Sequence, residues 1–104
     1  MKILGVTSCP SGVAHTYMAA EALETAAKNK GWTVKIETQG AIGIENEISI
    51  GEVQDADIII LTKDIAIKKE DRFKDKKIVR IGVSDAVKKA PQIMDKIAAH
   101  LASA

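Results

Sequence analysis

The stretch K-I-L-G-V-T-S-C-P-S-G-V-A-H-T, from Lys2 to Thr16, decides the fold of this chain. Its first six residues favour a β-strand and lead into a Ser-Cys-Pro-Ser-Gly cluster that is typical of a turn. A helix is predicted from about Val13 to Lys30, because apolar residues recur at helical spacing and Gly31 follows as a stop signal. The stretch therefore predicts a strand, a loop and a helix, the first unit of an α/β domain.

Strands and helices continue to alternate along the rest of the chain. Three more strands are predicted, over residues 32–38, 57–62 and 78–83. Residues 39–50 are expected to form a loop, and residues 49–55 a short helical turn. The last helix is expected to begin at the N-cap residue Ser84 and to hold Pro91 in its first turn. This order predicts a small, open, mainly parallel four-stranded sheet with helices on both faces, which is a doubly wound α/β fold.

Length and composition fit one globular domain over residues 1–104, of which 46% are apolar and 28% charged. Cys9 is the only cysteine, which excludes an internal disulfide and a zinc site built on several cysteines, and no metal or cofactor is expected. No apolar run approaches the roughly 20 residues of a membrane-spanning helix, and the N-terminus does not resemble a signal peptide. A cytoplasmic protein is therefore expected, and both a free subunit and a domain of a longer chain fit these features.

The charges argue against nucleic acid or an anionic membrane as a partner. Fifteen basic residues against fourteen acidic ones give a net charge of +1, and aromatic residues make up only 3% of the chain. Residues 63–77 depart from this balance, with seven basic and four acidic side chains and a net charge of +3. This segment is either a solvated surface or a docking surface for an acidic partner. Trp32, Phe73, Met18 and Met94 are expected to be core or packing residues rather than ligand contacts.

Cys9 directly follows the first predicted strand, at the edge of the sheet where open α/β folds bind ligands. The unpaired backbone N–H groups and the dipole of the helix that follows make this loop a site for anions and favour the thiolate form of a cysteine. The loop thus combines a nucleophile with a cradle for a phosphoryl group, as covalent transfer through a phosphocysteine requires. By residue type alone, a single cysteine is more often a buried apolar residue, so both interpretations stand at this point.

Several known phosphate-binding and redox motifs are missing from this sequence. The chain has no G-x-x-x-x-G-K-[ST] nucleotide loop, no G-x-G-x-x-G after the first strand and no C-x-x-C redox pair. Small tyrosine phosphatases place an arginine six residues after the nucleophilic cysteine, and here this position holds His15. Without that guanidinium clamp, the loop is expected to hold a phosphoryl group but to hydrolyse it slowly, which suits a carrier.

Four motifs in this sequence resemble those of one family. The segment C-P-S-G-V-A-H-T at Cys9–Thr16 resembles the C-P-T-G-I-A-H-T signature of enzyme IIB domains of the fructose family of the bacterial phosphoenolpyruvate-dependent sugar phosphotransferase system. The other resemblances, in order along the chain, are E-T-Q-G at Glu37–Gly40, the third strand with its following loop at residues 56–67, and D-R-F at Asp71–Phe73, where the family has E-R-F. The mild departures, Ser11 for Thr, Val13 for Ile and Asp71 for Glu, leave the cysteine in place.

The resemblance implies a phosphoryl carrier that acts as a protein-phosphohistidine–sugar phosphotransferase. Cys9 would accept a phosphoryl group from a phosphohistidine of enzyme IIA. It would then pass this group to a sugar, fructose or a related one, that the membrane component IIC holds during uptake. The protein would not insert into the membrane itself and would associate with the inner face through IIC.

The residues around Cys9 would form a phosphate loop that comprises Pro10, Ser11, Gly12, Val13, Ala14, His15 and Thr16. The segment from Pro10 to Ala14 would supply backbone donors and the geometry of the turn. His15 would either polarise the phosphoryl group or simply occupy the first helical turn. The hydroxyl groups of Ser11 and Thr16 would cap the helix or contact the phosphate.

Glu37, Gln39 and Arg72 are candidate neighbours of the site. Glu37 and Gln39 end the second predicted strand, where they either border the loop or are simply exposed. Arg72 either reaches the phosphoryl group or the partner, or forms a salt bridge within the charged segment.

Two other functions stay open on the sequence alone. A single-cysteine phosphatase or arsenate reductase would use the same nucleophile, although His15 stands where such enzymes have arginine. A non-enzymatic, flavodoxin-like binding module would use Ser11, Gly12 and Thr16 as a phosphate-binding loop.

Overall fold

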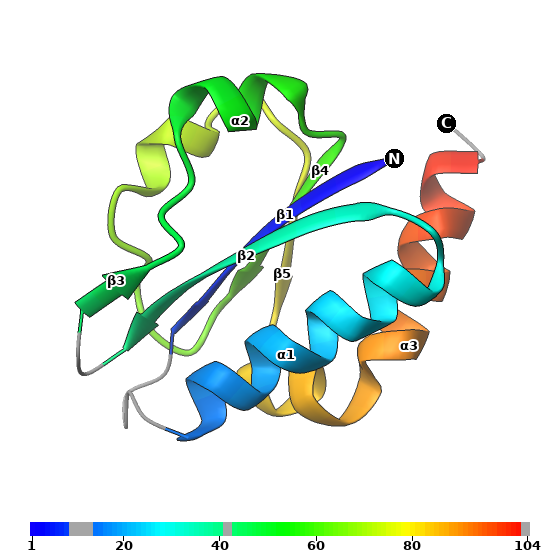
Figure 1. Cartoon of the computed structure of the whole chain (residues 1–104), viewed down its shortest axis with the longest axis horizontal. Coiled ribbons are helices and arrows are strands. Elements are labelled where there is room, and N and C mark those ends of the chain that lie inside the picture. The colour runs from blue at the N-terminus through cyan, green and yellow to red at the C-terminus, as the bar shows by residue number, and fades with distance from the viewer. Residues whose placement is uncertain (9–13, 41–42, 103–104) are drawn as a thin grey trace.

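Strands and helices alternate along the chain in a computed structural model that describes residues 1–8, 14–40 and 43–102. In chain order the elements are β1 (Lys2–Ser8), α1 (Ala14–Asn29), β2 (Thr33–Gly40), β3 (Gly43–Glu45), α2 (Ile50–Asp55), β4 (Ile58–Thr62), the short 3-10 helix η1 (Glu70–Phe73), β5 (Ile78–Ile81) and α3 (Val83–Ala102). Helices α1 and α3 cover one face of the sheet, whereas α2 and η1 lie over the other (Figure 1). None of the helices in the described ranges combines the length and apolar content that crossing a membrane requires.

The strands form one open sheet in the order β3-β2-β1-β4-β5. Strand β1 pairs in parallel with both β2 and β4, and β4 pairs in parallel with β5. The chain leaves β1 for β2 on one side and later returns to β4 on the other, so the direction of winding reverses between β1 and β4. Open α/β sheets bind ligands at the carboxyl ends of the strands at such a point. The predicted doubly wound α/β class is confirmed.

The sheet has a fifth strand that the sequence prediction missed. Residues 39–50 were expected to form a loop, but β2 continues to Gly40, and the short β3 pairs with it in antiparallel fashion. Gly43 has a φ of 105°, a backbone angle that glycine adopts without strain. The glycines at this point therefore permit a hairpin rather than an open loop.

Alternate residues of the central strands pack on opposite faces of the sheet. Ile3, Ile58 and Ile60 belong to the cluster under α1 and α3, whereas Leu4 and Ile59 belong to the cluster under α2 and η1. The predicted apolar run of β4 is covered on both faces, with residues 58–61 at most 1% exposed. Each such side chain contributes about 1.5–3 kcal/mol through its burial. The carboxyl ends of β1 and β4 are therefore anchored in the most tightly buried part of the molecule.

The start of α3 differs from the prediction. Ser84 was expected to be its N-cap, but the helix already begins at Val83. The carboxylate of Asp64 accepts a hydrogen bond from the Val83 backbone N–H at 2.7 Å and so satisfies one of the free donors of the first turn. Pro91 was expected in the first turn of α3 but lies inside this helix. The backbone leaves helical geometry at Lys89, just before this proline, so Pro91 stands at the start of the helical segment that follows the kink.

Three of the four residues assigned to the core do pack there. Phe73 and Met94 are fully buried, and Trp32 is half-buried against the same cluster as Met94. Met18 is not a core residue, because it is 49% exposed. Met18 lies beside the buried stripe of α1, which consists of Thr16, Ala19, Ala20, Leu23, Ala26 and Ala27.

The close approach of the strands at Gly5 gives a first prediction. A Cβ atom at Gly5 would lie 2.9 Å from Ile36 Cδ1 and 3.2 Å from the backbone oxygen of Ile60. We expect Gly5→Ala to lower the free energy of unfolding by about 1–3 kcal/mol in urea titrations, because the central strands must shift. Gly51→Ala is the matched control, since a Cβ there meets only Ser49 Oγ at 3.9 Å. Equal stabilities of the two variants would contradict this account.

Candidate functional site

The proposed nucleophile lies between two elements whose facing ends are described. Cys9, Pro10, Ser11, Gly12 and Val13 lie outside the described residues. Before them, β1 ends at Ser8 in the centre of the sheet, and after them α1 begins at Ala14. The five residues therefore join the carboxyl end of the central strand to the start of a helix, as the sequence predicts.

The first turn of α1 is fixed to β1 through Thr16. The Thr7 hydroxyl group donates a hydrogen bond to the Thr16 carbonyl oxygen at 2.9 Å, and both residues are fully buried. Ala14 and His15 are exposed at the start of the helix. The Thr16 hydroxyl group is itself buried and has no hydrogen-bond partner among the described residues. Thr16 thus fixes the start of the helix to β1 through its backbone carbonyl group.

Ser8, the last described residue before Cys9, is held from both sides by three hydrogen bonds that we call the Ser8 clasp. The Thr62 hydroxyl group accepts a hydrogen bond from the Ser8 N–H at 2.9 Å and donates one to the Ser8 carbonyl oxygen at 3.0 Å. The Ser8 hydroxyl group donates to the carbonyl oxygen of Gln39 at 3.1 Å. Sequence reasoning did not identify either Ser8 or Thr62 as part of the site.

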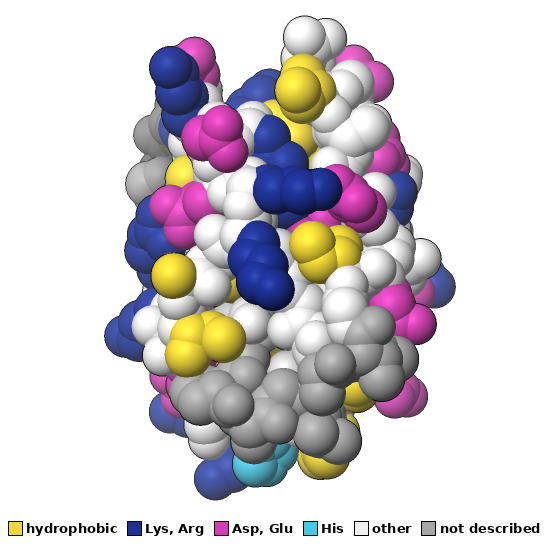
Figure 2. Space-filling view, turned by 90° about the vertical axis from the view of Figure 1, so that its left-hand side faces the viewer, with side chains coloured by type: hydrophobic (Ala, Val, Ile, Leu, Met, Phe, Trp, Pro, Cys, Tyr) yellow, Lys and Arg dark blue, Asp and Glu magenta, His cyan; other side chains and the backbone are white. Residues whose placement is uncertain are grey.

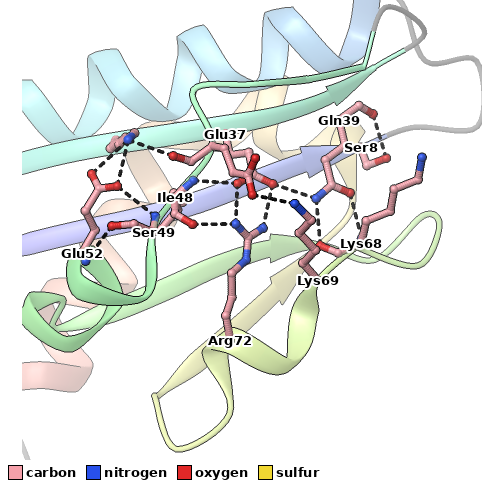
Figure 3. A network of polar contacts seen from close by, with 11 residues as sticks. Ser8, Glu37, Gln39, Ile48, Ser49, Glu52, Lys68, Lys69 and Arg72 are labelled. Atoms are coloured by element: carbon pink, nitrogen blue, oxygen red, sulfur yellow. Dashed lines mark hydrogen bonds and ion pairs between the residues drawn. The ribbon is translucent and has the colours of Figure 1, made fainter.

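Glu37 and Arg72 form a buried ion pair at the carboxyl end of β2 (Figure 3). Arg72 donates from Nη1 to Glu37 Oε1 and from Nη2 to Oε2, each at 2.7 Å, and Nη1 also donates to the carbonyl oxygen of Ile48 at 2.7 Å. The Ile48 N–H donates to Glu37 Oε1 at 2.8 Å. The side chains of Glu37 and Arg72 are 0% and 6% exposed. This pair joins β2, the residues before α2 and η1.

The guanidinium group of Arg72 lies over an aromatic ring. Its central carbon lies 4.6 Å from the centroid of Phe73, within the range of a cation–π contact. Nε of Arg72 is buried and has no hydrogen-bond partner among the described residues. The ion pair and the aromatic ring together fix the orientation of the guanidinium group.

Gln39 extends this network toward the Ser8 clasp. Its side-chain nitrogen donates to Glu37 Oε2 at 2.7 Å and to the carbonyl oxygen of Lys68 at 3.0 Å, and its side-chain oxygen accepts from the Lys68 N–H at 2.9 Å. The backbone carbonyl of the same residue accepts the Ser8 hydroxyl group. Figure 3 shows Gln39 between Ser8 on one side and Glu37 and Lys68 on the other. Contacts therefore run without interruption from Arg72 to Ser8.

Two interpretations of these residues need correction. Glu37 and Gln39 are not exposed strand-end residues, because they are 0% and 7% exposed. Arg72 does form a salt bridge, but with Glu37 rather than with an acidic residue of the charged segment. Hydrogen bonding compensates both buried charges, which explains why polar side chains are tolerated at this depth.

The ion pair also determines the ionisation of Glu37. Burial alone would raise the pKa of this carboxyl group. The hydrogen bonds from Arg72, Ile48 and Gln39 and the charge of Arg72 outweigh this effect, so the pKa of Glu37 lies below its ordinary value. Glu37 is therefore a fixed negative charge at neutral pH.

The basic segment over residues 63–77 presents less free charge than its composition indicates. Arg72 is buried against Glu37, Lys69 forms an ion pair with Glu47 at 2.7 Å, and Lys76 donates to two backbone carbonyl groups. On the side of the molecule that carries β3, basic and acidic side chains alternate rather than forming one continuous basic patch (Figure 2). Among the described residues, no group of three or more His, Cys, Asp or Glu side chains is placed to hold a metal ion.

The burial of the Glu37–Arg72 pair predicts an unusually large effect of mutation. Arg72→Met should lower the free energy of unfolding at pH 7 by about 3–5 kcal/mol, because it leaves the Glu37 carboxylate buried without its partner. Arg80→Met is the matched control, since Arg80 makes a similar two-point contact with Glu70, and both side chains are exposed, at 47% and 38%. It should cost less than about 1 kcal/mol. Equal losses in urea titrations would refute the structural role of the buried pair.

The lowered pKa of Glu37 predicts the pH dependence of this effect. A carboxyl group whose pKa is lower in the folded chain stabilises the fold fully above its unfolded pKa, about 4.3 for Glu, and loses this effect as the pH falls through the folded pKa. The difference in stability between the natural chain and Glu37→Gln should therefore be largest near neutral pH and shrink in acid. Urea titrations at decreasing pH measure it, and a difference that grows in acid would contradict the assignment.

Comparison with known proteins supplies the family. Residues 4–96 match the family model described as "PTS system, Lactose/Cellobiose specific IIB subunit". The PTS system fructose-like EIIB component 2 of Escherichia coli strain K12 is 68% identical over 101 residues, which cover 97% of this chain and 95% of that protein. The fructose-specific EIIB'BC component of Haemophilus influenzae is 48% identical over 90% of this chain, which spans only 17% of that longer protein.

Solved structures agree with these matches. The solution structure of an enzyme IIB subunit of the PTS system from Escherichia coli K12 superposes with a TM-score of 0.93 at 41% identity and covers 98% of this chain and 94% of that one. A domain of the fructose-specific IIABC component from Borrelia burgdorferi gives a TM-score of 0.86 at 41% identity, with 91% and 90% covered. The resemblance seen in the sequence motifs is confirmed, and the chain belongs to the enzyme IIB family of the sugar phosphotransferase system, with the fructose-like components among its relatives.

Proposed function

We propose that this chain carries a phosphoryl group on Cys9, from a phosphohistidine of a IIA protein to a sugar held by a membrane-embedded IIC component. Membership of the IIB family supports a role in phosphoryl transfer during sugar uptake. The observation that carries the assignment to Cys9 is its position. It is the only cysteine, and it directly follows the central strand at the point where the winding of the sheet reverses.

The transfer consists of two displacements at phosphorus. In the first, the thiolate of Cys9 attacks the phosphorus of phosphohistidine, the S–P bond forms, and the P–N bond breaks with its electron pair remaining on the imidazole nitrogen. In the second, a sugar hydroxyl oxygen attacks the same phosphorus. The O–P bond forms, the S–P bond breaks, the hydroxyl proton passes to a base or to solvent, and the thiolate is restored.

The start of α1 supports the thiolate and the phosphoryl group electrostatically. The first turn of α1 contains no acidic side chain among the described residues, so nothing there offsets the positive end of the helix dipole. Free backbone N–H groups at a helix start bind anions and lower the pKa of a nearby thiol. This arrangement favours both the attacking thiolate and the negatively charged group that it accepts.

The arginines favour a carrier over a phosphatase. A single-cysteine phosphatase needs a guanidinium group to clamp the phosphate during hydrolysis. The chain contains two arginines, and both are engaged, Arg72 with Glu37 and Arg80 with Glu70. Phosphorylated Cys9 would therefore hydrolyse slowly and would transfer its phosphoryl group to a sugar hydroxyl instead.

The names of the relatives support fructose or a related sugar and a IIC partner. The relatives at 68% and 48% identity are described as fructose-like and fructose-specific, which favours fructose over the sugars named in the family description. The Haemophilus influenzae relative is named EIIB'BC, so B and C parts are joined in one chain there. We infer that this chain acts in the cytoplasm, at the inner face of the membrane, where it meets a IIC component.

Phosphorylation in a reconstituted system tests the proposal. With phosphoenolpyruvate, the general components and a cognate IIA, the intact mass should rise by about 80 Da, the mass of one phosphoryl group. Cys9→Ser should show no such adduct, whereas the neighbouring variant His15→Gln should still acquire it. An unmodified natural chain, or an adduct that persists in Cys9→Ser, would overturn the assignment.

A further inference from the structure

The Ser8 clasp replaces regular strand pairing at the point where β1 and β4 end. The parallel register between these strands runs from Ile3 opposite Ile58 to Val6 opposite Leu61. Beyond it, the hydroxyl group of Thr62 contacts both the N–H and the carbonyl group of Ser8, at 2.9 and 3.0 Å. A single side chain thus satisfies both backbone groups of the residue that precedes Cys9.

We propose that Thr62 is a positioning residue for Cys9, and this inference rests on the proposed role of Cys9 as phosphoryl acceptor. The Ser8 carbonyl group is one half of the peptide unit that joins Ser8 to Cys9. Because a peptide unit is planar, holding its carbonyl group restricts the orientation of the whole unit. Thr62 therefore orients the backbone from which the nucleophile extends.

The surroundings of Thr62 suit a positioning role. Its side chain is 1% exposed, and it ends a strand in which every residue is buried. A β-branched side chain has few accessible rotamers, so a buried threonine holds its hydroxyl group in a fixed direction. The hydroxyl group acts as donor and acceptor at the same time, and both functions are used on Ser8.

Hydrogen bonds also fix the side of Ser8 that faces β2. Its hydroxyl group donates to the Gln39 carbonyl oxygen, and the Gln39 side chain is bound to Glu37 and to the backbone of Lys68. Ser8 itself is 2% exposed. A displacement of the reacting group by about 1 Å lowers the reaction rate by up to about a hundredfold. A rigidly held Ser8 backbone would therefore support rapid transfer to Cys9.

The test compares initial rates of phosphoryl transfer from phosphorylated IIA to three variants. Thr62→Val removes both backbone contacts of the hydroxyl group and keeps the shape of the side chain, so the rate should fall about tenfold or more. Thr62→Ser keeps the hydroxyl group and should remain within about threefold of the natural chain. Thr33→Val makes the same chemical change at the far end of β2, where Thr33 is exposed, and should leave the rate unchanged.

Two further measurements separate positioning from a loss of stability. The rate at which iodoacetamide alkylates Cys9 should be measured against pH, and the midpoint of this rate profile should differ between Thr62→Val and the natural chain. Val53→Ala weakens the core under α2 without touching Ser8, so it should lower stability but leave the transfer rate unchanged. If Thr62→Val fails to fold, Thr62→Ala is measured in its place, because it also removes both contacts with the Ser8 backbone, and its transfer rate should fall about tenfold or more.

The outcomes distinguish this inference from the proposed function. Transfer to Thr62→Val at the natural rate, an equal loss in Thr62→Ser, or an equal loss in Val53→Ala would overturn the role of Thr62. If Thr62→Val does not fold, transfer to Thr62→Ala at the natural rate would overturn it. A natural chain that takes up no phosphoryl group, or a Cys9→Ser variant that does, would instead overturn the assignment of Cys9.

Discussion

The buried ion pair between Glu37 and Arg72 holds together the edge of the sheet on which the candidate site is built. A carboxylate shielded from water needs its partner, and here the guanidinium group supplies two hydrogen bonds to the carboxylate and a third to the backbone of Ile48. The same carboxylate accepts from Gln39, whose backbone in turn accepts from Ser8. A pair of charges distant from Cys9 in sequence is thus connected, through Gln39, to the residue that precedes Cys9.

The topology explains why these contacts converge at one place. Strand β1 lies in the middle of the sheet, with β2 on one side and β4 on the other, and the carboxyl ends of all three lie at the same edge. Side chains and backbone groups from both neighbours therefore reach Ser8. The following helix places its N-terminus at the same edge, where it favours an anion. A fixed backbone beside a helix N-terminus suits a phosphoryl carrier. Such a carrier must orient the phosphoryl group without binding it so strongly that the next transfer becomes slow.

The sequence predicts the regular elements well and the long-range polar contacts poorly. Strong apolar runs and helical periodicity identify β1, β4 and α1, because burial imposes those patterns locally. The sequence does not predict β3, because this strand has only three residues and its segment contains two glycines, as a loop would. Glu37 and Arg72 are 35 positions apart, and their pairing depends on how β2 and η1 pack. Both residues belong to motifs that resemble those of the family, so the sequence identifies them as candidates. The pattern of apolar and polar residues does not reveal that their side chains contact each other. Thr62 is missed for a similar reason, because a threonine at a strand end is an ordinary strand residue until its partner is known.

The chemical identity of the phosphorylated atom is the most direct test of the account. A ³¹P nuclear magnetic resonance spectrum of the chain, phosphorylated by its IIA and recorded before any sugar is added, distinguishes phosphorus bound to sulfur from phosphorus bound to nitrogen or oxygen. We expect a single protein resonance with the chemical shift of a thiophosphate monoester, which disappears when sugar and IIC are supplied. A resonance of phosphohistidine, assignable to His15 for example, would contradict the central claim that Cys9 carries the phosphoryl group.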